Sequence, residues 1–137
     1  MPVLTFGVST PLHAESAYLV TLEFTDKNFA GARKEALKIV TDKGHHEYKK
    51  VLGLYGWSEF MLDNYLAAQG AFKKLVEIKP NDFDGNLGVA WTNIKLGKFD
   101  DVESYLGKAK SAARNWQRFM VTDARGWLAA KRGDPVV

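Results

Sequence analysis

Residues 61–82 read MLDNYLAAQGAFKKLVEIKPND, and residues 94–115 read IKLGKFDDVESYLGKAKSAARN. The two stretches share one layout, in which an aromatic residue follows a short turn and small or apolar residues then recur at three- and four-residue spacing. Residues 23–40, EFTDKNFAGARKEALKIV, show the layout a third time. Such spacing is typical of an amphipathic helix, so the sequence predicts three equivalent helices, each preceded by a turn.

The aromatic residue that opens each of these helices sets the period. Phe29, Tyr65 and Phe99 lie 36 and 34 residues apart. The positions three, seven and ten residues later are small or apolar in each case, which predicts one buried face per helix. These positions are Ala32, Ala36 and Ile39, then Ala68, Phe72 and Leu75, then Val102, Leu106 and Ala109. The first of these three helices is expected over residues 29–41, with an end near Gly44.

A period of about 34 residues, built from two helices and a terminal proline, resembles the tetratricopeptide repeat (TPR) family. Pro80 takes the terminal place in the second unit, whereas Gly44 and Arg114 replace it in the others. The chain also departs from the family where tyrosine is usual, at Glu23, Glu59 and Asn93. The resemblance implies an all-α fold, a right-handed superhelical stack of antiparallel helix hairpins (a TPR-like α–α solenoid) with about seven helices.

The length of 137 residues fits one domain. We expect a single TPR-like domain over residues 11–132, preceded by an extended segment at 1–10 and followed by a tail at 133–137. Its repeats are expected at about 13–48, 49–82 and 83–118. Residues 119–132 would form the capping helix that such a stack needs, with a first helix of the chain starting near Pro11.

Composition narrows the classes of protein. With 46% hydrophobic and 26% charged residues the chain has the balance of a globular domain. Having no cysteine excludes disulfides, thiolate nucleophiles and Cys-ligated zinc. No apolar run approaches the ~20 residues of a membrane span. Residues 1–14 resemble the end of an export signal without its basic start, so cytoplasm, which we favour, and periplasm both stay open.

Aligning the first helix of each unit brings three of the four tryptophans into one register. Trp57, Trp91 and Trp127 are equivalent, and Thr21 takes the fourth place. In the family resembled, this place faces the concave inner surface where peptides lie, so the resemblance implies an aromatic groove. With neighbours at helical spacing, the candidate partner-binding residues are Thr21, Phe24, Leu54, Trp57, Phe60, Met61, Leu87, Trp91, Ile94, Lys95 and Trp127.

Two interpretations of these tryptophans stay open. A large exposed apolar surface that contains tryptophan is typical of an interaction site, whereas an aromatic stripe at helical spacing is also typical of a core. The sequence therefore predicts a non-catalytic protein–protein interaction module that binds a peptide or helix of a partner in the groove. The alternative is a self-assembling structural or scaffold subunit, a homo-oligomer, of the kind found in secretion, pilus or envelope complexes.

Other motifs point to no further chemistry. Gly44-His45-His46-Glu47 is the one run with metal-ligand side chains, but no HExxH pattern follows, which favours a solvated turn. We find no nucleophile elbow, phosphate loop or dinucleotide motif, and expect no enzyme, no catalytic residue, no metal and no cofactor. The last third is basic, yet its cations are dispersed without a recognisable motif, so we expect no nucleic-acid partner.

One TPR subclass grips the C-terminal carboxylate of heat-shock chaperones with Lys, Asn and Arg side chains of the first helices. This sequence has Ala17, Thr21, Leu54, Asp84 and Gly88 at those places. We therefore expect no binding of chaperone tails of that kind, and a micromolar affinity for such a peptide would contradict this expectation.

Overall fold

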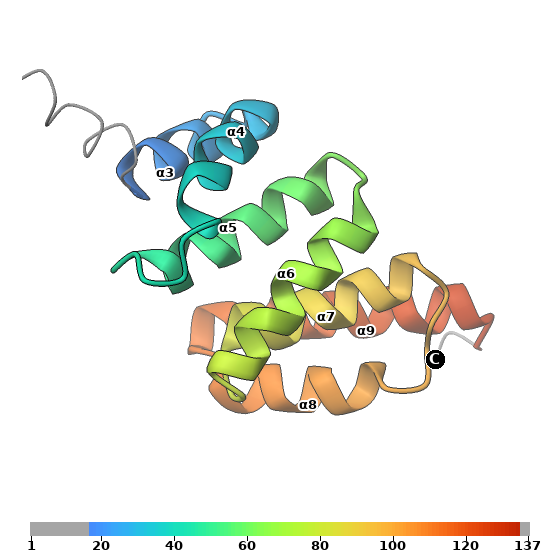
Figure 1. Cartoon of the computed structure of the whole chain (residues 1–137). Coiled ribbons are helices and arrows are strands. Elements are labelled where there is room, and N and C mark those ends of the chain that lie inside the picture. Colours follow the sequence, from blue (N-terminus) through green and yellow to red (C-terminus); the bar gives the residue numbers. More distant parts are fainter. Residues whose placement is uncertain (1–16, 135–137) are drawn as a thin grey trace, which may run out of the picture.

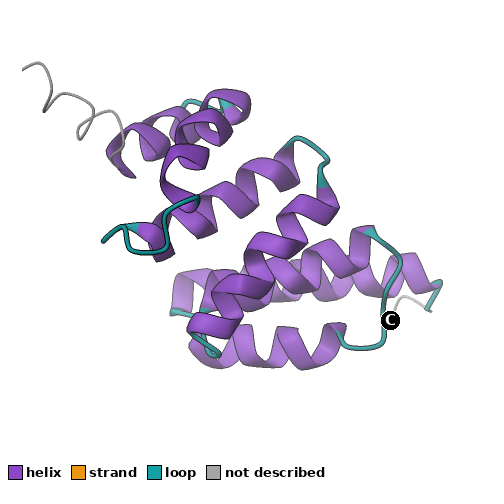
Figure 2. Cartoon of the chain, in the orientation of Figure 1, coloured by secondary structure: helices purple, strands orange, loops and turns teal. Residues whose placement is uncertain are grey.

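The computed structural model describes residues 17–134, and every regular element in that range is a helix. Three antiparallel hairpins follow one another and a last helix closes the stack (Figure 1, Figure 2). The hairpins are α3 (Ala17–Thr25) with α4 (Phe29–Val40), α5 (Tyr48–Met61) with α6 (Tyr65–Ile78), and α7 (Phe83–Lys95) with α8 (Val102–Ala112). A short 3-10 turn, η2 (Asn115–Gln117), leads into α9 (Arg118–Arg132). The expected start of the first helix near Pro11, the segment 1–10 and the end of the tail lie outside the described residues.

The hairpins stack in chain order, because the second helix of each hairpin packs against the first helix of the next. In Figure 1 the stack runs from α3 and α4 at the upper left to α8 and α9 at the lower right. The first helices also contact one another in sequence, α3 with α5, α5 with α7, and α7 with α9. These four helices therefore form one continuous face of the stack, and this face carries the site described below.

The turns within the hairpins repeat one construction. Two residues after the end of each first helix comes a residue in the left-handed region. The N–H of the residue that follows it donates to the carbonyl oxygen five residues earlier, which is a Schellman-type end. The left-handed residues are Lys27 (φ 62), Asp63 (φ 64) and Gly97 (φ 74). The corresponding N···O distances are 2.9 Å for Asn28–Glu23, 2.8 Å for Asn64–Glu59 and 2.8 Å for Lys98–Asn93. The repeat seen in the sequence is thus also a repeat of backbone geometry.

Replacing Lys27 with glycine is expected to stabilise the protein. A residue with a Cβ atom is strained at positive φ and glycine is not, so Lys27→Gly should raise the free energy of unfolding by about 1 kcal/mol. Lys43 is an exposed turn residue outside the positive-φ set, so Lys43→Gly is the matched control and should lower stability slightly. Urea denaturation of both variants measures the difference, and equal effects of the two substitutions would contradict this origin of the gain.

The second and third hairpins are joined through Phe72, whose side chain is fully buried. Its ring lies against Gly56 of α5 and Gly88 of α7. A Cβ atom at Gly56 would lie 2.7 Å from Cε1 of Phe72, and one at Gly88 would lie closer still to the ring. Neither position tolerates a side chain without a shift of the ring. The two glycines therefore allow α5 and α7 to approach α6 from both sides.

The first and second hairpins share a buried carboxylate. Glu59 is 2% exposed and accepts hydrogen bonds from Arg33 Nε at 2.7 Å, Tyr55 Oη at 3.1 Å and Asn64 Nδ2 at 3.1 Å. A buried charge needs such partners. Glu59 takes the place where the family resembled usually has tyrosine, and it ties α4, α5 and the following turn together. In the next repeat the equivalent Asn93 accepts a buried hydrogen bond from Gln69.

The loop before α5 corrects one expectation. The helix α4 ends at Val40, and Thr41 is its C-terminal cap residue, so Gly44 does not cap it. Gly44 lies in the loop, where its N–H donates to Oδ1 of Asp42 at 3.0 Å. In the same loop Oε1 of Glu47 accepts the N–H of Ala17 at 3.0 Å, which connects the loop to α3.

Candidate functional site

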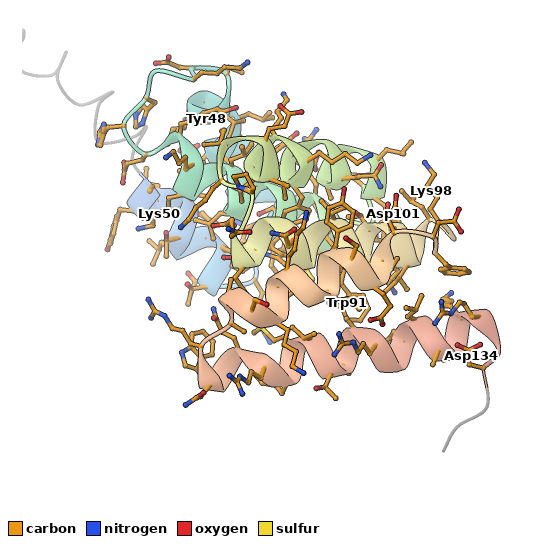
Figure 3. The ribbon with its side chains drawn as sticks, turned by 90° about the horizontal axis from the view of Figure 1, so that it is seen from below. Tyr48, Lys50, Trp91, Lys98, Asp101 and Asp134 are labelled. Atoms are coloured by element: carbon orange, nitrogen blue, oxygen red, sulfur yellow. The ribbon has the colours of Figure 1, made fainter. Side chains whose placement is uncertain are left out.

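A groove of about 700 Å³ lies on the face formed by the first helices. Its walls come from α3, α5, α7 and α9, with the end of α6 and the turn after it. Six of the eleven sequence-predicted residues line it, namely Thr21, Phe24, Leu54, Trp57, Leu87 and Trp91. Figure 3 labels Trp91, on α7 next to α9, and Lys50, near the start of α5.

Trp57 both lines the groove and packs within the stack. Its ring centroid lies 4.7 Å from that of Phe72 and 5.7 Å from that of Phe60, with the rings edge to face. Its indole N–H donates to Oδ1 of Asp84 at 3.2 Å, which links α5 to α7 across the groove. The two interpretations of this tryptophan therefore do not exclude each other, since one edge is anchored and the rest of the ring borders the groove.

Five predicted residues lie outside the lining. Ile94 is 1% exposed and belongs to the core between α7, α8 and α9, so its assignment to the groove wall is wrong. Phe60 is half-buried, with its ring between those of Tyr65 at 5.3 Å and Trp91 at 6.2 Å. Met61 is exposed at the end of α5. These three side chains therefore do not border the groove.

The remaining two predicted residues, Lys95 and Trp127, contact each other, and Trp127 also packs against Trp91. The ring centroid of Trp127 lies 6.2 Å from that of Trp91, and Nζ of Lys95 lies 4.9 Å above the Trp127 ring. A cation at this distance from an indole is attracted by the ring electrons. Trp127 is 45% exposed. Of the three equivalent tryptophans, Trp57 and Trp91 therefore line the groove, whereas Trp127 lies outside the lining on the surface of α9.

Sequence reasoning missed the residues two turns before each tryptophan. Lys50, Asp84 and Met120 are each seven positions before Trp57, Trp91 and Trp127, which places them on the same helix faces. All three line the groove, together with Lys49, Lys79, Asp82, Phe119 and Asp123. The seven-residue spacing from each tryptophan could have identified Lys50, Asp84 and Met120. The prediction instead followed each helix toward its C-terminal end.

The charges of the lining are arranged in two groups. Lys49 and Lys50 come from α5, whereas Asp84 and Asp123 come from α7 and α9. Desolvation of the Asp84 carboxyl among the lining side chains raises its pKa, the hydrogen bond from Trp57 works against this rise, and the nearby Asp82 adds to it. The lining is thus mostly apolar, with lysines on α5, aspartates on α7 and α9, and the Lys79–Asp82 pair in the segment between α6 and α7.

Replacing Asp84 with asparagine is expected to stabilise the protein at neutral pH. Because the pKa of Asp84 is raised on folding, the native state binds its proton more tightly than the unfolded chain, and stability falls as pH rises from the ordinary pKa through the raised one. Asparagine still accepts from Trp57 and stays neutral. Urea denaturation should show a gain at about pH 7 that disappears at about pH 3. A gain of equal size at both pH values would contradict the assignment.

Two further properties concern the described part of the chain as a whole. No helix within residues 17–134 combines the length and the apolar character needed to cross a membrane. In the same range no three His, Cys, Asp or Glu side chains come together in an arrangement that could bind a metal ion. His45 uses Nδ1 to accept the N–H of Glu47 at 3.1 Å, so its ring takes part in the structure of the loop.

Comparison with known proteins bears on the fold. No protein-family model matches the sequence, and no curated protein matches it. Among solved structures, PcrH from Pseudomonas aeruginosa is similar, with a TM-score of 0.70 over 90% of this chain and 92% of the PcrH chain. The two sequences are 16% identical, so the likeness is one of fold. With its all-helical hairpin repeats, the chain has a TPR-like helical-repeat fold, as the sequence predicted.

Proposed function

We propose that this protein is a non-catalytic interaction module that binds a segment of a partner protein in the groove. The observation that carries this proposal is the lining, in which Trp57, Trp91 and Leu54 border a groove on the face formed by the first helices of the hairpins. Tryptophan is enriched among residues that dominate binding energy, because it buries a large area and keeps a polar N–H. Stacks of helical repeats use such faces to bind proteins.

The charges of the lining define the segment further. An apolar centre would lie against the tryptophans, in an extended or helical conformation. An acidic residue of the segment beside α5 would meet Lys49 and Lys50, and a basic residue beside α7 and α9 would meet Asp84 and Asp123. The walls of the groove are helices packed into the stack, and a binding surface on such ordered elements lowers the entropic cost of association.

An affinity capture from a lysate of the source organism tests the proposal. The wild-type protein is compared with the folded Trp57→Ala/Trp91→Ala variant and with Trp116→Ala, whose side chain is 61% exposed and outside the lining. Mass spectrometry identifies the captured proteins, and calorimetry with a synthetic segment then confirms direct binding. A partner captured by the wild type and Trp116→Ala, but not by the double variant, is the expected result. Equal capture by all three would contradict the groove as the binding site.

A structural role in self-assembly is the second candidate. It is favoured by apolar side chains exposed at both ends of the stack, with Tyr18 and Leu22 on α3 and Trp116 and Phe119 before and on α9. Such faces, different at the two ends, associate head to tail. Sedimentation velocity over a wide range of concentrations measures this. An increase in size with concentration would support assembly, and a monomer throughout would contradict it.

A further inference from the structure

The helix α9 has one covered face and one uncovered face. The covered face carries Val121, Ala124 and Leu128, which are at most 1% exposed and pack with α7 and α8. The opposite face carries Phe119, Gly126 and Ala130, all exposed. In α5 and α7 the places equivalent to Gly126 and Ala130 are covered by α6 and α8, the second helices of their hairpins, whereas Lys49 at the place of Phe119 in α5 is exposed. Within residues 17–134 no helix covers this face of α9.

Aligning Trp127 with Trp91 shows which residues of α7 are equivalent to the uncovered face of α9. Trp91 and Trp127 are 36 residues apart, so Phe119, Gly126 and Ala130 correspond to Phe83, Ala90 and Ile94 of α7. The three α7 residues lie in the core against Val102, Leu106 and Ala109 of α8. Phe119 is instead 64% exposed. The face of α9 has the position and the apolar side chains of a helix-packing surface, and no helix of the described range packs on it.

Gly126 determines which side chain such a helix would place over α9. Its equivalent in α5 is Gly56, where the ring of Phe72 occupies the space that a Cβ atom would need, 2.7 Å from Cε1. Among residues 17–134 a Cβ atom at Gly126 would meet nothing within 4 Å. The space that Phe72 fills over Gly56 is therefore free over Gly126, and an aromatic ring of a docking helix fits there.

Asp123 determines a second contact. Its equivalent in α5 is Gly53, where an ideal Cβ atom would lie 3.6 Å from Cδ2 of Leu75, three residues after Phe72. The exposed Asp123 puts a carboxylate at this place in α9. A docking helix that carries lysine or arginine three residues after its aromatic residue would pair with this carboxylate, whereas leucine would leave it unpaired.

We propose that the uncovered face of α9 binds an amphipathic helix of a partner protein, which takes the place of a second hairpin helix. The helix carries an aromatic residue that packs over Gly126 and a basic residue, three positions later, that pairs with Asp123. Phe119 and Asp123 belong both to this face and to the groove lining, whereas Gly126 and Ala130 lie outside the lining. Gly126→Leu therefore distinguishes binding at the α9 face from binding in the groove.

A peptide derived from the chain's own α6 tests the proposal. Its sequence is that of residues 64–79, NYLAAQGAFKKLVEIK, with lysine at the place of Leu75, fluorescently labelled and blocked at both ends. Fluorescence anisotropy is expected to show saturable binding to the full chain. Gly126→Leu fills the space over α9 and is expected to weaken binding at least about tenfold. No saturable binding to the wild type up to about 1 mM peptide would overturn the proposal.

Matched variants test whether the peptide binds at the α9 face. Gly70→Leu is the same change at an exposed helical glycine of α6 whose Cβ atom would also meet nothing within 4 Å, and it should bind the peptide as the wild type does. A loss of binding in this variant would overturn the proposal. Both leucine variants should melt no earlier than the wild type, since glycine is unfavourable inside a helix.

A charge exchange tests the pairing with Asp123. A second peptide carries glutamate at the place of the lysine. The wild type should bind the lysine peptide about threefold more tightly, and Asp123→Lys should reverse the order by a similar factor. An unchanged order would overturn the pairing. Self-association of the wild type without peptide, abolished by Gly126→Leu, would assign the face to a second copy of the chain and overturn its assignment to a partner.

Discussion

The Trp57→Ala/Trp91→Ala variant is expected to lose about a thousandfold or more in affinity for the segment that binds in the groove. Each tryptophan borders the groove and offers a large apolar surface, and truncation of one such anchor costs about 2 kcal/mol or more. Two truncations of this size together amount to about three orders of magnitude in Kd. Isothermal titration calorimetry with the captured partner segment measures the loss.

The stability of the variants must be measured beside their affinity. Trp57 packs on Phe72 and donates to Asp84, so its truncation should also lower the free energy of unfolding by roughly 2–3 kcal/mol. Binding is therefore compared at a temperature where circular dichroism shows both proteins folded, with Trp116→Ala as the control. A double variant that is less stable but binds as the wild type does would show that the two tryptophans serve the core alone.

Phe72→Ala is expected to lower the free energy of unfolding by about 4 kcal/mol. The ring is fully buried between two hairpins, and removing it leaves a cavity that close packing with Gly56 and Gly88 prevents from collapsing easily. A loss of this size is a large part of the stability of a small domain. Urea denaturation measures it, and a loss below about 1 kcal/mol would contradict the close packing of this ring.

Gly88→Ala tests the same contact from the other side. The added methyl group would overlap the Phe72 ring, so this substitution should be destabilising by about 1–3 kcal/mol, although alanine usually favours a helix. Gly107→Ala, in α8 with open space at the Cβ position, is the control and should be neutral or stabilising. Combining Gly88→Ala with Phe72→Leu should cost less than the sum of the single changes, because the smaller side chain can move away. If the free-energy costs of the two substitutions were additive, the strain of Gly88→Ala would not come from its contact with Phe72.

The fold could be predicted from the sequence because its repeat is local. Phe29 and Tyr65 begin α4 and α6 as predicted, whereas α8 begins at Val102, three residues after Phe99. The apolar positions after each aromatic residue are buried as expected. The turns show why the repeat survives weak sequence likeness. Lys27, Asp63 and Gly97 have chemically different side chains, yet each takes a positive φ. The repeated turn geometry was therefore harder to predict from the sequence than the spacing of the apolar residues.

The candidate site could be predicted only in part. Helical periodicity identified the face on which Trp57 and Trp91 lie, since this depends on residue spacing alone. Periodicity did not show toward which end of the helices the groove extends, because this depends on the packing angles between four helices. The groove extends toward Lys50 and Asp84, two turns before the tryptophans, whereas Ile94 on the other side is sealed into the core by α8 and α9.

Glu59 has a consequence for how the stack comes apart. A chain of similar repeats unfolds readily from its ends, where each unit has one neighbour instead of two. Here the terminal hairpin supplies Arg33 to a carboxylate that is buried in the next hairpin. Opening the first hairpin alone would break this ion pair and its 2.7 Å hydrogen bond, and would leave only Tyr55 and Asn64 as partners of the carboxylate. The ion pair therefore suppresses fraying and favours cooperative unfolding of the first two hairpins, so that the groove wall formed by α3 remains in place.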